Sequence, residues 1–340
     1  MRQILYIILL VTLVIFGVSL FNKFTNDYFN SKSINKLVAE NNSKQIGLLL
    51  NIFGPEKVVK KLYDEYLSSY SFDCNKDAYY VGKVSYRVLK DKALDDFIQY
   101  CNSGYMQGSV REYIYQTGLD DFQVYTSSLC GRFETKFKEL ECYHAVGNGL
   151  LASAKGDTYR ALKLCGYFNT YGKRGSCYLG VFIESNGSLG TNYKQNSLNK
   201  NVCEEYEDNS EIAKSCYLVN FPYLTLKSLK TSDLRKIAPA CLNVRNKDNI
   251  SNCFFGYGIR AAIISNYVPD KIVDLCVSVP ADMKYRASCF SGAVAGIVDF
   301  FGPELGSRGN DYCSFLPNEY RSSCLANLSS RLKIVSETNN

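Results

Sequence analysis

The stretch Cys253-Phe-Phe-Gly-Tyr-Gly-Ile-Arg-Ala-Ala-Ile-Ile264, followed by Pro269-Asp-Lys-Ile-Val-Asp-Leu-Cys276, decides the fold. In the second phrase, proline and aspartate occupy the first turn and the apolar residues fall at helical spacing, which predicts a helix ending at Cys276. The first phrase mixes glycine with large apolar residues. Glycine costs a helix about 1 kcal/mol relative to alanine, so its use here predicts a buried helix that another helix approaches closely.

The two phrases recur along the chain at a nearly constant interval. Cysteine pairs at positions 130/142, 165/177, 203/216, 241/253, 276/289 and 313/324 mark them. The members of a pair lie 11 to 13 residues apart, and the first members of successive pairs lie 35 to 38 residues apart. A fixed period of this length is the signature of a repeat architecture. The pattern predicts an all-α protein in which disulfide-linked helical hairpins stack into an α-solenoid.

Two pairing schemes fit the cysteine spacing. The first closes the short loops and uses every cysteine: Cys74–Cys101, Cys130–Cys142, Cys165–Cys177, Cys203–Cys216, Cys241–Cys253, Cys276–Cys289 and Cys313–Cys324. The second joins neighbouring pairs, for example Cys142 to Cys165, and leaves Cys130 and Cys324 without partners. The first is favoured because no cysteine is left over, and each bridge around a dozen residues would contribute about 3 kcal/mol.

Composition excludes several classes of protein. The chain has 340 residues, 46% hydrophobic and 21% charged, so most of it is not disordered. Fourteen cysteines are typical of an oxidising compartment rather than the cytosol. No two cysteines are closer than 11 positions, which disfavours zinc, iron–sulfur and haem ligation, and a single histidine excludes sites that need two. We expect no cofactor and no metal.

The amino terminus predicts a membrane anchor. Residues 4–21 are 18 residues without a charge, close to the roughly 20 that span a bilayer. Residues 1–3 would then form a cytoplasmic tip, with the cysteine-rich bulk outside the membrane. The alternative is a cleaved signal peptide, for which Gly17-Val18-Ser19 offers small residues, and the protein would then be secreted.

The remaining segments are assigned from local patterns. Residues 22–54 are expected to form a polar stalk ended by an apolar run, and residues 55–128 a helical region with divergent repeats. Pro55 is expected to begin its first helix, with Val58, Val59, Leu62, Tyr63 and Tyr66 on one face. Residues 129–330 carry the cysteine-pair repeats, and residues 331–340 are expected to be a disordered tail.

The phrase of an aliphatic helix ending in cysteine, a loop, and then Cys-aromatic-x-Gly resembles the cysteine-rich Sel1-like repeat proteins. That resemblance covers about residues 130–330 and implies a secreted solenoid of helical hairpins with one disulfide per repeat. A second phrase, Cys142-x-His144-x-x-Gly147-x-Gly149, resembles the Cys-x-His-Gly-x-Gly-His phrase of exported microbial proteins. Ala145 and Asn148 stand here where that phrase has glycine and its second histidine.

Candidate site residues come from the repeats. His144 is the one side chain that titrates near neutral pH without a shift, and with Glu184 it is the catalytic candidate. Arg260 and Asp299 are charges on otherwise apolar helices, and they could line the concave face of a solenoid. The loops between paired cysteines carry basic residues that could stack into a ridge for an anionic polymer, among them Lys173, Arg174, Arg245, Arg286 and Arg321.

These observations favour a binding protein over an enzyme. We expect a membrane-anchored extracytoplasmic scaffold whose partner is a protein, a peptide or a cell-envelope polymer, because repeats give extended surface and no catalytic constellation is present. The alternative is an envelope enzyme with a groove site around His144 and Glu184. Nucleic acid is not an expected partner outside the cell, and no fold for it is recognised.

Overall fold

The protein is all-helical in the computed structural model, which describes residue 23 and residues 25–71, 73–95, 97–185, 202–224, 231–279, 282–301 and 306–336. No strand occurs within these ranges, as the sequence predicted. The first helices are α2 (Ile34–Ala39), α3 (Ser43–Phe53), α4 (Pro55–Ser69), α5 (Cys74–Leu89), η1 (Lys90–Leu94) and α6 (Gly104–Thr117). The repeat region follows with α7 (Phe122–Gly131), α8 (Lys136–Ser153), α9 (Thr158–Cys165), α10 (Tyr171–Ser185), η2 (Val202–Tyr206), α11 (Ser210–Leu224), α12 (Thr231–Leu242), α13 (Asp248–Ile264), α14 (Pro269–Val277), α15 (Met283–Phe301), α16 (Gly306–Phe315) and α17 (Asn318–Ser336).

Each repeat is a short helix followed by a long helix, with one disulfide between them. The first cysteine lies in or near the last turn of the short helix, except in η2, and the second lies five or six residues into the long helix. The structure forms the short-loop bridges of the first scheme, with Cα–Cα separations of 5.2 to 5.6 Å and no cysteine left free. The disulfides therefore staple each hairpin, and they indicate an oxidising, extracytoplasmic environment.

The long helices begin earlier than the repeated phrase suggested. The phrase that marks each long helix opens at the second cysteine, yet α8 begins at Lys136, six residues before Cys142. The reason is local capping: the Thr135 hydroxyl accepts a hydrogen bond from the Lys138 amide at 3.2 Å. Cys142 therefore lies within α8 rather than at its first residue, and its side chain is fully buried.

Pairs of glycines bring the long helices into backbone contact. A Cβ added at Gly180 in α10 would lie 1.9 Å from the His144 carbonyl of α8, and one at Gly147 would lie 2.0 Å from the Cys177 carbonyl. The same reciprocal contact joins Gly82 with Gly108, and Gly258 with Gly292. In every case the carbonyl belongs to the residue three before the partner glycine. The prediction that glycine permits close helix approach is confirmed.

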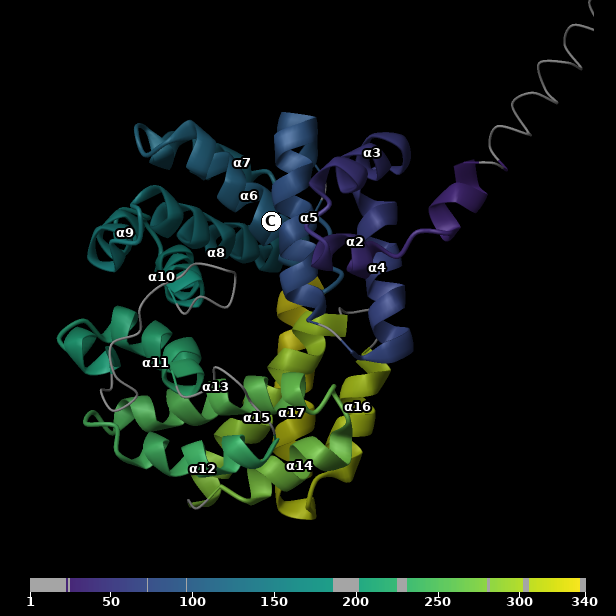
Figure 1. The fold of residues 1–340 in the computed structure, drawn as a ribbon. Helices are drawn as coiled ribbons and strands as arrows, with labels where there is room; N and C mark the ends of the chain where they lie inside the picture. Colours follow the sequence, from purple (N-terminus) through teal and green to yellow (C-terminus); the bar gives the residue numbers. More distant parts are fainter. Residues whose placement is uncertain are drawn as a thin grey trace, which may run out of the picture.

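The array of helices curves back so that its first and last parts meet (Figure 1). Phe300 of α15 packs edge-on against Tyr66 of α4, with ring centroids 5.3 Å apart. Arg331 of α17 forms a bidentate pair with Asp299 of α15 at 2.8 and 2.6 Å, and α17 also contacts α8. The helices thus follow one another in the repeat-like order that the cysteine period predicted, along a path that closes on itself.

The amino-terminal segments pack into this fold. Residues 22–54 were expected to form a stalk, but α2 and α3 lie against α4 and α5, and Ile46, Leu49 and Leu50 are buried. The reason is that the apolar run on α3 fills the face that α5 would otherwise expose. Pro55 begins α4 as predicted, and the predicted apolar face of α4 is buried.

Two further expectations concern the chain ends. The tail predicted for residues 331–340 is helical as far as Ser336, because Arg331 is held by Asp299; residues 337–340 lie outside the described residues. The membrane span predicted at residues 4–21 also lies outside them. Among the helices that the structure does describe, none has the length and apolar character needed to cross a bilayer.

Candidate binding pocket

A pocket of about 410 Å³ opens where the amino-terminal helices meet the carboxy-terminal ones. We call it the His144 pocket. Its lining comes from α4 to α6, α8, α10, α13 and α15, and from the turns beside them: Tyr66, Tyr70, Ser71, Asp73, Cys74, Asn75, Asn102, Gln107, His144, Ile183, Arg260, Ile263, Asn266, Tyr267 and Phe300. Its volume falls within the roughly 300–1,000 Å³ typical of small-molecule sites.

The pocket brings together two of the candidate residues, His144 and Arg260. Contacts between glycines and the backbone of neighbouring helices fix the positions of both. His144 lies three residues before Gly147, and its own carbonyl rests against Gly180. Arg260 lies two residues after Gly258, whose contact is the Cys289 carbonyl of α15. His144 and Arg260 are 116 positions apart in the chain, and both line the pocket. The rigid helix pairs α8/α10 and α13/α15 therefore set the positions of these side chains.

His144 is a neutral imidazole at physiological pH. Burial lowers its pKa from 6.5 to about 4, because an enclosed site disfavours the charged form. Its Nε2 atom has no hydrogen-bond partner among the described residues. One turn further along α8, the Asn148 side-chain amide is also buried and, within the same described part of the chain, has no partner for its oxygen or nitrogen. Buried polar atoms of this kind are rare in folded proteins and mark places where a water or a ligand is accommodated.

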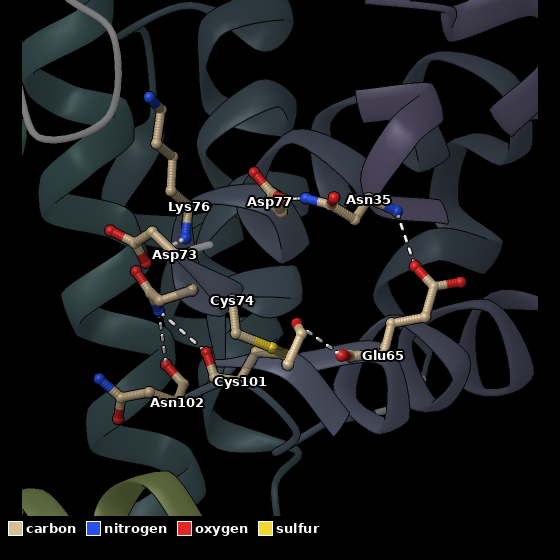
Figure 2. Close-up of a disulfide and its surroundings, with 10 residues drawn as sticks. Asn35, Glu65, Asp73, Cys74, Lys76, Asp77, Cys101 and Asn102 are labelled. Atoms are coloured by element: carbon tan, nitrogen blue, oxygen red, sulfur yellow. Dashed lines mark hydrogen bonds between the residues drawn. A yellow bond between two sulfur atoms is a disulfide. The ribbon is translucent and has the colours of Figure 1, made fainter. Parts of the chain in front are cut away.

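One wall of the pocket includes Cys74, a member of a disulfide, and Figure 2 shows this disulfide and its surroundings. Cys74, at the start of α5, is bonded to Cys101, just before α6. The Asn75 side chain donates to the carbonyls of Cys101 and Asn102 at 3.1 and 3.0 Å, and Asp73 caps α5 by accepting from the Lys76 amide. These bonds hold the turn that carries Asn102 against the beginning of α5.

Left-handed backbone conformations are concentrated around this pocket. Tyr70, Asn102, Asn266 and Tyr267 all have φ between 49° and 59°, and all four line it. Such conformations cost non-glycine residues free energy and persist only where the surroundings impose them. The turns that end α4 and α13 and precede α6 therefore present these side chains in fixed positions.

Aromatic rings form a second wall. The Tyr267 ring stacks on Phe300 with centroids 4.3 Å apart, and Phe300 also contacts Tyr66. These three residues come from the first and last parts of the described array. The wall therefore exists because the array closes, and none of its parts would present it alone.

Glu184 is not part of the pocket lining. Its carboxylate accepts a hydrogen bond from the Tyr79 hydroxyl at 2.9 Å and lies 3.6 Å from the Arg111 guanidinium. Burial raises the pKa of Glu184, while Arg111 and Tyr79 act in the opposite direction. The neighbouring Ile183 faces the pocket instead. Of the two catalytic candidates, only His144 therefore belongs to the lining of the His144 pocket.

Asp299 belongs to a partly buried ionic cluster beside the pocket. It pairs with Arg331, and Glu141 of α8 faces the same pair. Burial, and then the charge of Asp299, raise the pKa of Glu141 to about 7, although Arg331 and a hydrogen bond from Gln107 act against that rise. Gln107 also lines the pocket, so one side chain connects the cluster to the pocket wall.

The basic residues between paired cysteines serve mainly to hold the hairpins. Arg174, Arg286 and Arg321 each lie three residues before the second cysteine, and each donates to the carbonyl three residues after the first, at 3.1, 3.2 and 2.7 Å. Lys173 pairs with Glu139 at 2.9 Å, and Arg174 also pairs with Glu211. Arg245, whose side chain is 80% exposed, lies 3.9 Å from Glu207. The five basic side chains proposed to form a ridge therefore all have contacts within the protein.

Sequence reasoning singled out His144 and Arg260 separately, as a catalytic and a binding candidate, and missed most of the remaining lining. Asn102 and Gln107 follow Cys101 in a segment that the sequence showed only as a divergent repeat. No sequence signal points to them, because the left-handed turn over Cys101, Asn102 and Ser103 that places them is not apparent from the residue pattern. Glu141 was missed because an acidic residue before a cysteine looks like an ordinary surface charge.

Comparison with protein-family models, with curated proteins and with solved structures finds no match for this chain. The Sel1-like resemblance therefore stays a prediction from the sequence.

Proposed function

We propose that this protein is a membrane-anchored, extracytoplasmic helical-repeat scaffold that binds a protein, a peptide or a cell-envelope polymer through the His144 pocket. The observation that carries the proposal is the pocket itself, which gathers His144, Arg260 and Gln107 from three separate helix pairs. A disulfide-stapled fold with backbone-to-backbone helix contacts can hold such a constellation without reorganising, which lowers the cost of binding.

The compartment and the anchor support the same function. Seven disulfides favour an oxidising space outside the cytoplasm. The apolar segment at residues 4–21 would tether the repeats to the outer face of a membrane. A tethered binding module near the membrane surface is positioned to meet envelope components as they pass.

A binding role accounts for the side chains better than the envelope-enzyme alternative. His144 has its pKa lowered away from neutrality, whereas an efficient general base has a pKa near the working pH. Glu184, the second group that the enzyme hypothesis requires, is engaged by Tyr79 and Arg111. The same neutral imidazole is well suited to donate or accept one hydrogen bond to a ligand.

The test is capture by the full chain in detergent of isolated envelope polymers and envelope proteins from the host. We expect a partner that the wild type retains and that Arg260→Gln weakens by at least tenfold. Arg245→Gln is the matched control, since it removes an equal charge at an exposed position. Retention that is equal in both variants would contradict a pocket-based function.

A further inference from the structure

We infer that the His144 pocket binds an acidic saccharide, whose carboxylate is directed to Arg260 and whose hydroxyl groups meet the amides and phenols around it. This inference rests on the proposed binding function and names the chemical class of the ligand. It follows from three features of the pocket: where its charges lie, which polar groups line it, and from which part of the chain those groups come.

The pocket has a positively charged side chain within it and a negatively charged one at its edge. Arg260 is partly buried within the pocket, and Asp73 is exposed at its edge, where its carboxylate already accepts a hydrogen bond from the Lys76 amide. His144 adds no charge there. Arg260 thus brings a guanidinium to the pocket lining, and a planar guanidinium can bind a carboxylate with two parallel hydrogen bonds.

The polar groups suit a ligand with several hydroxyls. Gln107 is only 3% exposed, and its amide nitrogen donates to the Asn102 carbonyl at 3.3 Å. The side-chain amides of Gln107, Asn102 and Asn266 each combine donor and acceptor atoms, as a sugar hydroxyl does. The buried Nε2 of His144 has no partner in the described part of the chain and can form one more such bond. A buried polar site of this type strongly rejects ligands that leave its groups unpaired.

Another part of the pocket lining is aromatic. Tyr66, Tyr267 and Phe300 line the pocket, and phenolic rings combine an apolar body with a polar tip. A pyranose ring has the matching character, because it carries C–H groups on its faces and hydroxyls around its rim. A simple inorganic anion would use Arg260 and leave this wall without a partner.

The lining also distinguishes a saccharide from a peptide. Peptide recognition usually pairs the peptide backbone with an exposed strand edge or lays an amphipathic helix into an apolar groove. The described residues of this pocket offer neither a strand edge nor an apolar helix groove: they come from helices and from the turns beside them, and they include four side-chain amides, an arginine and an aspartate. Side-chain recognition of a polyhydroxylated ligand is therefore favoured over peptide binding.

The test compares three small probes by calorimetric titration against the full chain in detergent: D-glucuronate, D-glucose and N-acetylalanine. Glucuronate and glucose differ in the carboxylate, and N-acetylalanine supplies a carboxylate without the sugar ring. We expect glucuronate to bind at least tenfold more tightly than either of the other two. Arg260→Gln should abolish the preference for glucuronate over glucose, and Arg245→Gln should retain it.

Arg260→Lys guards against a folding defect in the glutamine variant. It keeps the positive charge but loses the bidentate geometry, so it should fold like the wild type and bind glucuronate several-fold more weakly. Equal affinity for glucose and glucuronate, or a preference that survives Arg260→Gln, would overturn the inference. So would N-acetylalanine binding as tightly as glucuronate, which would identify a peptide carboxylate as the ligand.

The failure of this inference can be told apart from failure of the proposed function. If the full chain captures an envelope partner in an Arg260-dependent way but binds none of the three probes, the acidic-saccharide assignment is wrong and the binding function stands. If it neither captures a partner nor binds a probe, both are wrong.

Discussion

Gly147 and Gly180 face each other across α8 and α10, and each lies against a main-chain carbonyl of the other helix. The contact is reciprocal because Gly180 meets the carbonyl of His144 and Gly147 meets that of Cys177. The carbonyl of His144, the only histidine in the sequence, therefore packs directly against Gly180, where an added Cβ would overlap it. The position of a pocket residue and the packing of the repeats are thus fixed by the same two glycines.

Replacing Gly180 by alanine should destabilise the protein by about 1–3 kcal/mol or more, because the new methyl group would overlap backbone that cannot move independently. The control is Gly175→Ala on the same helix, where an added Cβ would meet nothing within 4 Å. That variant should be unchanged or more stable by up to about 1 kcal/mol. Denaturant unfolding without reducing agent measures both, and equal effects would contradict the glycine-contact model.

Glu141→Gln should change how stability depends on pH. The pKa of Glu141 is raised to about 7 in the folded protein, compared with 4.5 in the unfolded chain, so the folded state holds the proton more tightly. Its contribution is therefore fully present below pH 4.5 and is lost as the pH rises through 7. At pH 8 the glutamine variant should be more stable than wild type, by on the order of 1–3 kcal/mol. At pH 4 the two should be close, and a variant that is less stable at pH 8 would contradict this assignment.

Arg286→Gln should loosen one hairpin loop. Its guanidinium donates to the Val279 carbonyl at 3.2 Å, in the arrangement that Arg174 and Arg321 repeat. Loss of this charge-assisted bond should cost about 1–2 kcal/mol. Arg245→Gln, at an exposed position in an equivalent loop, should cost less than about 0.5 kcal/mol. Identical unfolding midpoints for the two variants would show that the repeated carbonyl contact has no structural role.

Removal of the Cys74–Cys101 bridge should weaken ligand binding, because Cys74 of this disulfide belongs to one wall of the pocket. The double alanine variant should lose about 3–4 kcal/mol of stability, as expected for a 27-residue separation. Removing Cys313–Cys324, which closes 11 residues outside the pocket lining, should cost about 3 kcal/mol and leave affinity unchanged. Calorimetric titration at a temperature where both variants are folded separates the effects, and equal affinity losses would contradict the assigned wall.

Much of the fold could be predicted from cysteine spacing. A bridge restricts which helices can be neighbours, so the positions of Cys165 and Cys177 were enough to predict a hairpin between them. The glycine three residues after Cys177 added the close approach of the next helix. These are local patterns, and local patterns are what a sequence displays directly.

The pocket could be predicted only in part. His144 and Arg260 attracted notice because each is unusual for its helix. Tyr66 and Phe300 did not, because their contact depends on the curvature of the whole array, which accumulates from small rotations between repeats. The pairing of Asp299 with Arg331 was missed for the same reason: the two residues lie on different helices, and an arginine near the end of the chain looks like part of a tail.

The most direct test of the central claim uses the single histidine as a reporter. Since the chain contains only His144, an NMR spectrum of histidine ring carbons and protons gives one signal, and that signal comes from the pocket. We expect a pKa of about 4 for this signal, and a chemical-shift change that saturates with ligand in wild type and is lost in Arg260→Gln. Ligand binding that leaves the His144 signal unmoved, or a His144 pKa near 6.5, would contradict it.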